Sequence, residues 1–156
     1  MKTPDTLLAF ALERQRYALP LSSVKRVIRA VEITALPKAP DIVLGVINVR
    51  GRVIPVVDVR KRFGLPKREM GLNDQLIIAE TPKRPVALFA DRVDGVFKID
   101  KRDVIKAERI LPGTSYVERV VKLADDLLLI HDLSRFLALD EEKALSEALK
   151  ENKDPQ

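Results

Sequence analysis

Short apolar runs, rather than long amphipathic stretches, dominate the pattern of hydrophobic and polar positions along the chain. The runs are rich in Val, Ile and Leu and end at Pro, Gly or charged residues, which is typical of β-strands. Such strands, at spacings of about ten residues, favour a mainly β fold of one or two small barrels. The pattern predicts ten strands: Leu7 to Leu12, Arg16 to Leu21, Val27 to Leu36, Gly45 to Asn48, Val53 to Asp58, Gln75 to Glu80, Pro85 to Asp91, Gly95 to Ile99, Val117 to Leu123 and Leu127 to His131.

One segment near the C-terminus has helical periodicity instead. Residues 140–150, DEEKALSEALK, begin with acidic residues and end with a lysine, as the helix dipole favours. Leu145, Ala148 and Leu149 form a narrow apolar stripe. We expect this helix to pack on the body of the protein, and the tail after it to fray.

Two aspartates end similar apolar strands about half the chain length apart. Asp58 ends VIPVVD and Asp132 ends LLLIHD, and a basic turn and a phenylalanine follow each one. Each carboxylate is well placed to cap a short helix, and the weak repeat favours two barrels of similar build. Short helical segments are also expected after Ser22 and Asp41. Paired catalytic carboxylates would need an acid–base partner that the sequence does not offer.

The inventory of reactive side chains argues against an enzyme. The 156 residues include no cysteine and one histidine, and no phosphate-binding, metalloprotease or serine-hydrolase motif is present. His131, at a strand end, is more typical of a structural or surface histidine than of a general base. Asp91 and Asp94 could suggest a cation site, but a turn at Asp94-Gly95 explains them more simply. We expect a binding or scaffold protein without metal or cofactor.

The N-terminal apolar stretch is too short for a signal peptide or a membrane span, so we expect a soluble, cytoplasmic protein. The net charge of +5 is concentrated between residues 50 and 68. This concentration raises an alternative function, a basic small-barrel module that binds nucleic acid or another anionic surface. Aromatic residues are only 4% of the chain, and Phe63 alone lies in the basic stretch, so a solvated basic face is favoured.

The stretch GVINVRGRVIPVVDVR, residues 45–60, interrupts its strand pattern with residues that need a reason. Gly51 permits positive φ in a tight connection, and Gly45 predicts a bulge or a close backbone approach. Pro55 cannot donate to a β-ladder, so its strand should have a free or bulged side. Arg50 offers a planar donor fork for a carboxylate. Together these residues predict an open strand edge that serves for docking.

The same stretch resembles the CheW family of chemotaxis adaptors. It matches the family pattern G-V-x-N-[LV]-R-G-x-[IV]-[IV]-P-[IV]-[IV]-D-[LV]-R from Gly45 to Arg60. The resemblance extends from Leu7 to Leu139 and implies two packed five-stranded SH3-like barrels within residues 1–139. Residues 140–156 would then be a C-terminal helix and tail. Supporting matches are Phe10-Ala11-Leu12 with Tyr17-Ala18-Leu19, Leu36-Pro37, Val93-Asp94-Gly95-Val96 and Leu128-Leu129-Ile130.

The resemblance also implies a function, that of a non-enzymatic adaptor coupling chemoreceptors to the histidine kinase CheA in a bacterial array. One barrel would pair with the regulatory domain of CheA, and an apolar groove between the barrels would receive the chemoreceptor cytoplasmic tip. Membrane contact would be indirect, through the receptors. Carried over by position, the implied partner-binding residues are Val24, Arg26, Val27, Gly45, Val46, Asn48, Val49, Arg50 and Gly51.

One position departs from the family pattern. Arg26 stands where the family commonly has a glutamate, and that glutamate can pair with the arginine that corresponds to Arg50. Two cations at close range would repel. Either Arg50 pairs with Glu32 or with a partner's acid, or the protein serves a receptor class with a different tip. The signalling pathway stays open between flagellar chemotaxis, pilus motility and another kinase output.

Overall fold

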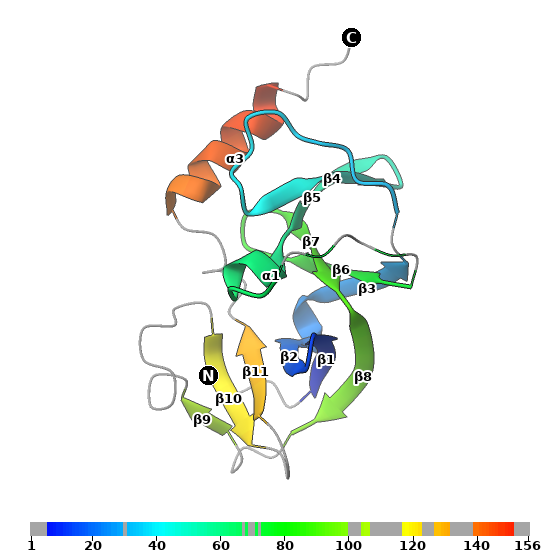
Figure 1. The fold of residues 1–156 in the computed structure, drawn as a ribbon, viewed down its shortest axis with the longest axis vertical. Helices are drawn as coiled ribbons and strands as arrows, with labels where there is room; N and C mark the ends of the chain where they lie inside the picture. Colours follow the sequence, from blue (N-terminus) through cyan, green and yellow to red (C-terminus); the bar gives the residue numbers. More distant parts are fainter. Residues whose placement is uncertain are drawn as a thin grey trace.

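Two β-sheets and a C-terminal helix make up the fold (Figure 1). The structure, a computed structural model, describes residues 6–29, 31–66, 68, 71, 73–99, 104–106, 117–122, 127–131 and 139–151. In this part of the chain no helix is long and apolar enough to cross a membrane.

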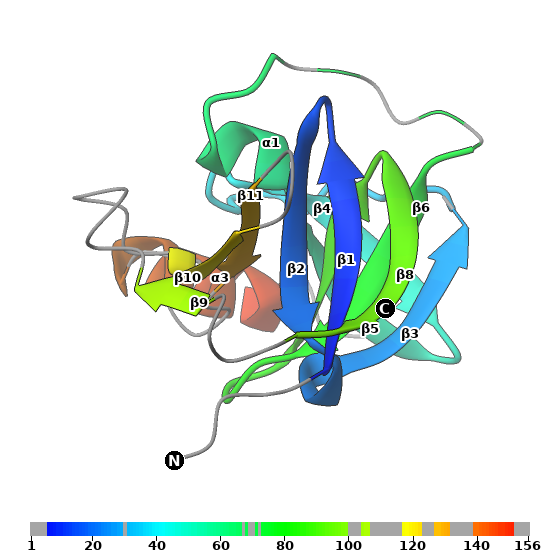
Figure 2. The same cartoon turned by 90° about the horizontal axis from the view of Figure 1, so that it is seen from below.

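The first sheet has six strands in the order β8-β1-β2-β11-β10-β9. Neighbouring strands are antiparallel except β11 and β2, which are parallel. Figure 2 shows β1 lying between β2 and β8. The strands are β1 (Thr6–Leu12), β2 (Gln15–Pro20), β8 (Arg92–Lys98), β9 (Val104–Lys106), β10 (Val117–Lys122) and β11 (Leu127–His131).

The second sheet has five strands in the order β3-β6-β7-β5-β4. The chain enters this sheet after β2 and leaves it after β7, so the first sheet is built from both ends of the chain and the second from its middle. The two barrels are therefore not successive halves of the sequence. The strands are β3 (Val24–Arg29), β4 (Val43–Val49), β5 (Arg52–Val57), β6 (Gln75–Glu80) and β7 (Pro85–Ala90).

Three apolar cores hold the sheets together, one within each sheet and one shared between them. In β1, Leu7 packs inside the first sheet, whereas Phe10 enters the shared core. In β6, Leu76 packs inside the second sheet, whereas Ile77 enters the shared core. These strands are buried on both faces, which is why they are continuously apolar rather than alternating in sequence.

The predicted mainly β fold of two packed barrels with a C-terminal helix is confirmed. Each of the ten expected strands has a counterpart, and β9 is an additional short strand that brings the first sheet to six. The strand expected from Val27 to Leu36 is misplaced, because its pairing with β6 runs only from Val24 to Arg29. Beyond it the chain crosses to β4, where Thr34 pairs with Val46.

The predicted helical segments have mixed outcomes. Asp58 caps the short helix α1 (Val59–Arg62), its Oδ1 accepting from the Lys61 amide at 3.1 Å. A 3₁₀ helix η1 (Leu21–Ser23) takes the place of the turn expected after Ser22. The helix expected after Asp41 is wrong, because a turn closed by Val43 N donating to Pro40 O leads directly into β4. Asp132 lies outside the described residues.

The C-terminal helix α3 (Leu139–Glu151) packs against the second sheet and α1 (Figure 1). Leu145 and Ala148 are buried, and Leu145 belongs to the shared core. Arg84, in the β6–β7 turn, donates to Ser146 Oγ at 2.8 Å and pairs with Glu142 at 2.9 Å. The expected packing of the apolar stripe is thus confirmed. Residues 152–156, expected to fray, lie outside the described part.

Candidate protein-docking site

A tight hairpin joins β4 to β5 at the centre of the family-like stretch. Arg50 and Gly51 form a two-residue loop with φ of 52° and 85°, the combination expected for a type I′ turn. The side chain of Asn48 accepts a hydrogen bond from the Gly51 amide at 2.8 Å. The positive φ expected for Gly51 is confirmed, and Arg50 shares it. An arginine in this conformation is held against an intrinsic preference of about 1 kcal/mol or more.

Gly45 lies where two backbone segments meet. It follows a register shift between β4 and β5, and its φ is 152°. A Cβ atom added here would lie 2.4 Å from Thr34 O and 2.7 Å from Ile33 Cγ2. The predicted bulge and close approach are both confirmed. A substitution at Gly45 therefore disturbs the fold, so it cannot serve as a test of docking alone.

The free strand side expected at Pro55 is confirmed, but the open sheet edge expected there is wrong. β5 is an inner strand, and Pro55 is buried opposite Val46 of β4. Its missing N–H is tolerated because β5 pairs with β7 only at Val56 and Val57, beyond the proline. The edge strand is β4 instead. That edge is partly covered, since Thr34 and Val46 exchange two backbone hydrogen bonds of 2.8 Å.

The nine predicted partner-binding residues divide into three groups by burial. Gly45 is buried. Val24 and Val27 of β3, with Val46 and Val49 of β4, are half-buried, and all but Val46 pack against apolar cores. The exposed members are Arg26, Asn48, Arg50 and Gly51. Docking contacts at these positions remain a prediction. The predicted residues that a partner can reach are those of the hairpin tip and Arg26 of β3.

Of the two acids considered as partners of Arg50, Glu32 and an acid of another protein, Glu32 does not pair with it. Among the residues that the structure describes, neither Arg50 nor Arg26 nor Glu32 takes part in an ion pair. Arg26 and Arg50 are both exposed. Their guanidinium groups are thus available to a carboxylate from another molecule.

Part of the basic stretch is neutralised within the fold, which the sequence did not reveal. The side chain of Arg60 is only 3% exposed; it contacts Asp91 and Glu13 carboxylates at 2.7 Å each and donates to Pro66 O at 3.0 Å. Arg68 makes a bidentate pair with Asp74 at 2.9 and 3.1 Å. It also reaches Asp91 at 2.5 Å. These arginines do not form the solvated basic face predicted from composition.

Asp91 connects the two sheets at this network. It lies between β7 of the second sheet and β8 of the first, and its Oδ2 accepts from the Glu13 amide at 2.9 Å as well as from Arg60. Burial by itself would raise the pKa of Asp91, but the hydrogen bonds from Arg60, the Glu13 amide and Arg68 outweigh it and lower the pKa below its ordinary value. In the sequence, the only sign of this ion-pair network was an aspartate at the end of a predicted strand, with arginines elsewhere in the chain.

The remaining residues considered for catalysis or cation binding are Asp94 and His131. Asp94 accepts from Arg92 at 2.5 Å. The predicted Asp94-Gly95 turn is wrong, because both residues belong to β8, where the register with β1 shifts between Ala9 and Phe10. His131 ends β11, and its side chain is not among those described. The described residues contain no cluster of three potential metal ligands.

Fold and site together define a two-barrel β module with a hairpin exposed at one edge. The family model for the CheW-like domain matches residues 6–141. The chain therefore belongs to the CheW-like domain family, and the resemblance seen in its sequence is confirmed.

Individual relatives support this assignment. The chain is 30% identical to the chemotaxis protein CheW of Bacillus subtilis over 148 residues, 94% of each chain. It is 34% identical to the chemotaxis protein CheW of Rhizobium meliloti over 98 residues, a match that spans 63% of each protein's length. The crystal structure of the scaffolding protein TtCheW from Thermoanaerobacter tengcongensis superposes with a TM-score of 0.81 at 31% identity, covering 89% of this chain and 96% of that one.

Proposed function

We propose that this protein is a non-enzymatic adaptor that couples chemoreceptors to a CheA-type histidine kinase. The observation that carries the proposal is the family match over residues 6–141, together with relatives named as chemotaxis and scaffolding proteins. The kinase contact would be its regulatory domain, and the receptor contact the cytoplasmic tip. The protein would act as a scaffold in the cytoplasm, because the proposed receptor contact is the cytoplasmic tip.

The geometry supports contacts at the β4–β5 hairpin. The hairpin tip is held by the Asn48–Gly51 hydrogen bond, so it is preorganised rather than loose. Val53, the cross-strand neighbour of Asn48, is 57% exposed beside it. A partner that covers this exposed valine would remove its apolar surface from water, which favours association.

A bridging assay tests the proposal directly. Vesicles that display receptor cytoplasmic segments are mixed with the kinase, and the kinase that sediments is measured with and without the adaptor. We expect co-sedimentation that requires the adaptor and saturates with its concentration. A well-folded adaptor that binds neither the kinase regulatory domain nor the receptor segment would refute the proposal.

Two matched variants locate the contact. Val53→Glu adds a charge beside the hairpin, and Val96→Glu makes the same change on β8 of the first sheet, at a valine that is 54% exposed. Neither valine belongs to an apolar core, so both proteins should melt like the unaltered chain. We expect Val53→Glu to weaken binding to one partner about tenfold or more and Val96→Glu to leave that binding unchanged. Equal effects of the two variants on that partner would remove the hairpin from the interface.

The basic alternative loses part of its support in the structure. Arg60, Arg62 and Arg68, three basic residues of the stretch, are paired with acids of the same chain. A surface that binds nucleic acid must present its cations to phosphates.

A further inference from the structure

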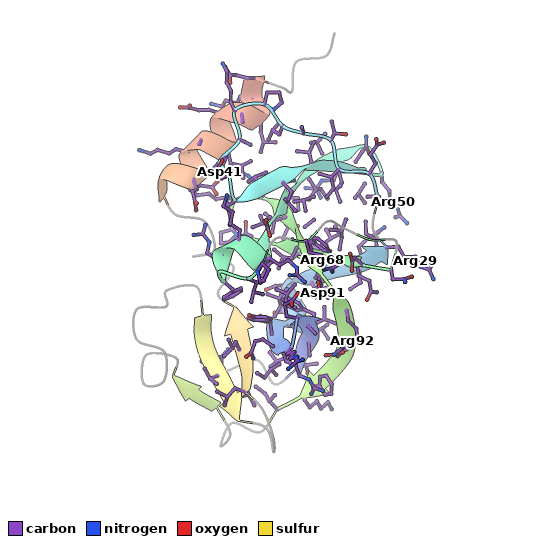
Figure 3. All side chains as sticks on the ribbon, in the orientation of Figure 1. Arg29, Asp41, Arg50, Arg68, Asp91 and Arg92 are labelled. Carbon is purple, nitrogen blue, oxygen red and sulfur yellow. The ribbon has the colours of Figure 1, made fainter. Side chains whose placement is uncertain are left out.

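Four exposed arginines lie on β3 and at the β4–β5 hairpin of the second sheet, and we call this group the arginine edge. Arg26 and Arg29 lie on β3, and Arg50 and Arg52 lie at the β4–β5 hairpin. Figure 3 shows Arg29 and Arg50 at the same side of the molecule, and Figures 1 and 2 place the end of β3 and the hairpin at that side. The segment between β3 and β4 is tied to β4 through Thr34 and Val46.

The arginine edge differs from the other arginines in having no internal acids. Within the described part of the chain, none of its four members forms an ion pair or a side-chain hydrogen bond. Arg60, Arg68 and Arg84, by contrast, each contact a carboxylate within 2.9 Å. The acid nearest along the chain to Arg26 and Arg29 is Glu32, which is exposed and unpaired in the same part. The edge therefore carries a net positive charge that the fold does not neutralise.

Apolar side chains accompany these charges. Val31, after β3, and Val53, after the hairpin, are among the most exposed apolar residues described. None of the described aromatic rings belongs to β3, the hairpin or the segment between them. Arginine is enriched at protein interfaces. Surfaces for single-stranded nucleic acid, in contrast, interleave their cations with stacking aromatics.

We propose that the arginine edge binds an acidic segment of a protein partner and thereby selects which kinase or receptor this adaptor couples. The inference rests on the proposed function and adds the chemistry of the partner: two or more carboxylates beside an aliphatic contact. Bidentate pairing with guanidinium groups supplies the attraction. Repulsion by these cations rejects partners that present lysines or arginines to them.

Charge reversal with matched controls tests the inference. Arg26→Glu, Arg29→Glu and Arg50→Glu, singly and combined, are compared with Arg14→Glu and Lys143→Glu, which change net charge equally at exposed positions elsewhere. The dissociation constants for a kinase regulatory domain and for a receptor tip segment from the same organism are measured at low and high salt. Thermal melts check that each variant is folded.

We expect each reversal at the edge to weaken binding to one of the two proteins about tenfold at low salt, and the combination more than about a hundredfold. The differences should shrink at high salt, and the controls should change binding less than about threefold. Changing the partner's acidic residues to lysine should restore binding to the reversed variants. If edge reversals have no more effect than the controls while the unaltered protein binds, the inference is wrong and the proposed function stands.

Two further outcomes would also overturn it. If the unaltered protein binds neither partner, both the proposed function and this inference fail. If it binds a short DNA duplex or phosphatidylserine vesicles in a salt-sensitive way that the edge reversals abolish, and does not lose protein binding in the same variants, the edge recognises phosphates rather than carboxylates.

Discussion

Replacing Asp91 by alanine is the sharpest test of how the two sheets are held together. Asp91 accepts from Arg60 at 2.7 Å, from Arg68 at 2.5 Å and from the Glu13 amide at 2.9 Å. Its removal leaves the Arg60 guanidinium, on a side chain 3% exposed, with Glu13 and one backbone carbonyl. Breaking a buried ion pair from one side costs about 3–5 kcal/mol. Because Glu13 remains, we expect a loss near the lower limit, about 3 kcal/mol.

Urea unfolding followed by circular dichroism measures this loss, with the denaturant dependence checked for a two-state transition. The control is Asp41→Ala, because Asp41 is 92% exposed and contacts Lys61 at 3.8 Å, which should cost about 0–1 kcal/mol. A double-mutant cycle with Arg60→Met should show a coupling of about 1–3 kcal/mol. If Asp91→Ala costs no more than Asp41→Ala, the network does not join the sheets in the way we describe.

Three further predictions concern stability. The pKa of Asp91 is lower in the folded than in the unfolded protein, so its carboxylate stabilises the fold above the unfolded-state pKa, near 4. The free energy of unfolding should therefore fall as the pH drops below about 4, and less steeply in Asp91→Asn. Parallel pH profiles of the two proteins would contradict this. Gly45→Ala places Cβ 2.4 Å from Thr34 O and should lower the free energy of unfolding, measured in urea, by about 3 kcal/mol or more. Gly51→Ala has open space around its Cβ but a φ of 85°, and should lower that free energy by about 1 kcal/mol. Equal losses would show that the backbone around Gly45 moves to make room for the Cβ. Leu145→Ala should lower the free energy of unfolding by about 2–5 kcal/mol, because Leu145 is fully buried. The control Lys143→Ala, at an exposed position of the same helix, should lower it by less than about 0.5 kcal/mol. A small loss at Leu145 would mean that α3 is not part of the core.

Local patterns predicted the strands and the hairpin because the relevant interactions are close in sequence. The β4–β5 turn depends on Gly51 and on a side chain three residues before it, and the Asp58 cap depends on an amide three residues later. The prediction of β3 was wrong at both ends because a strand extends only as far as its ladder partner, here β6, which lies far away in the chain. The free side at Pro55 was predicted correctly, but the sheet edge expected there was wrong, since strand order is a tertiary property.

The functional site was only partly visible in the sequence. The motif from Gly45 to Arg60 pointed to the family, and the family match confirms it. In the sequence, Arg50, Arg60 and Arg62 belong to one basic stretch, but in the fold they differ in exposure and in ion pairing. Arg60 lies on α1 against Asp91, whereas Arg50 lies at an exposed turn without an internal acid among the described residues.

The sequence by itself determined the strand-rich character, the tight turn, the helix cap and the family of this protein, because each follows from short-range conformational preferences or from a contiguous motif. Only the tertiary structure decided which arginines are neutralised and which face solvent. Asp91 is 31 residues from Arg60, and the order of the strands brings them together. The same order leaves the arginine edge without an ion pair among the described residues, because a charge acts on what lies within a few ångströms in space and not on its neighbours in sequence.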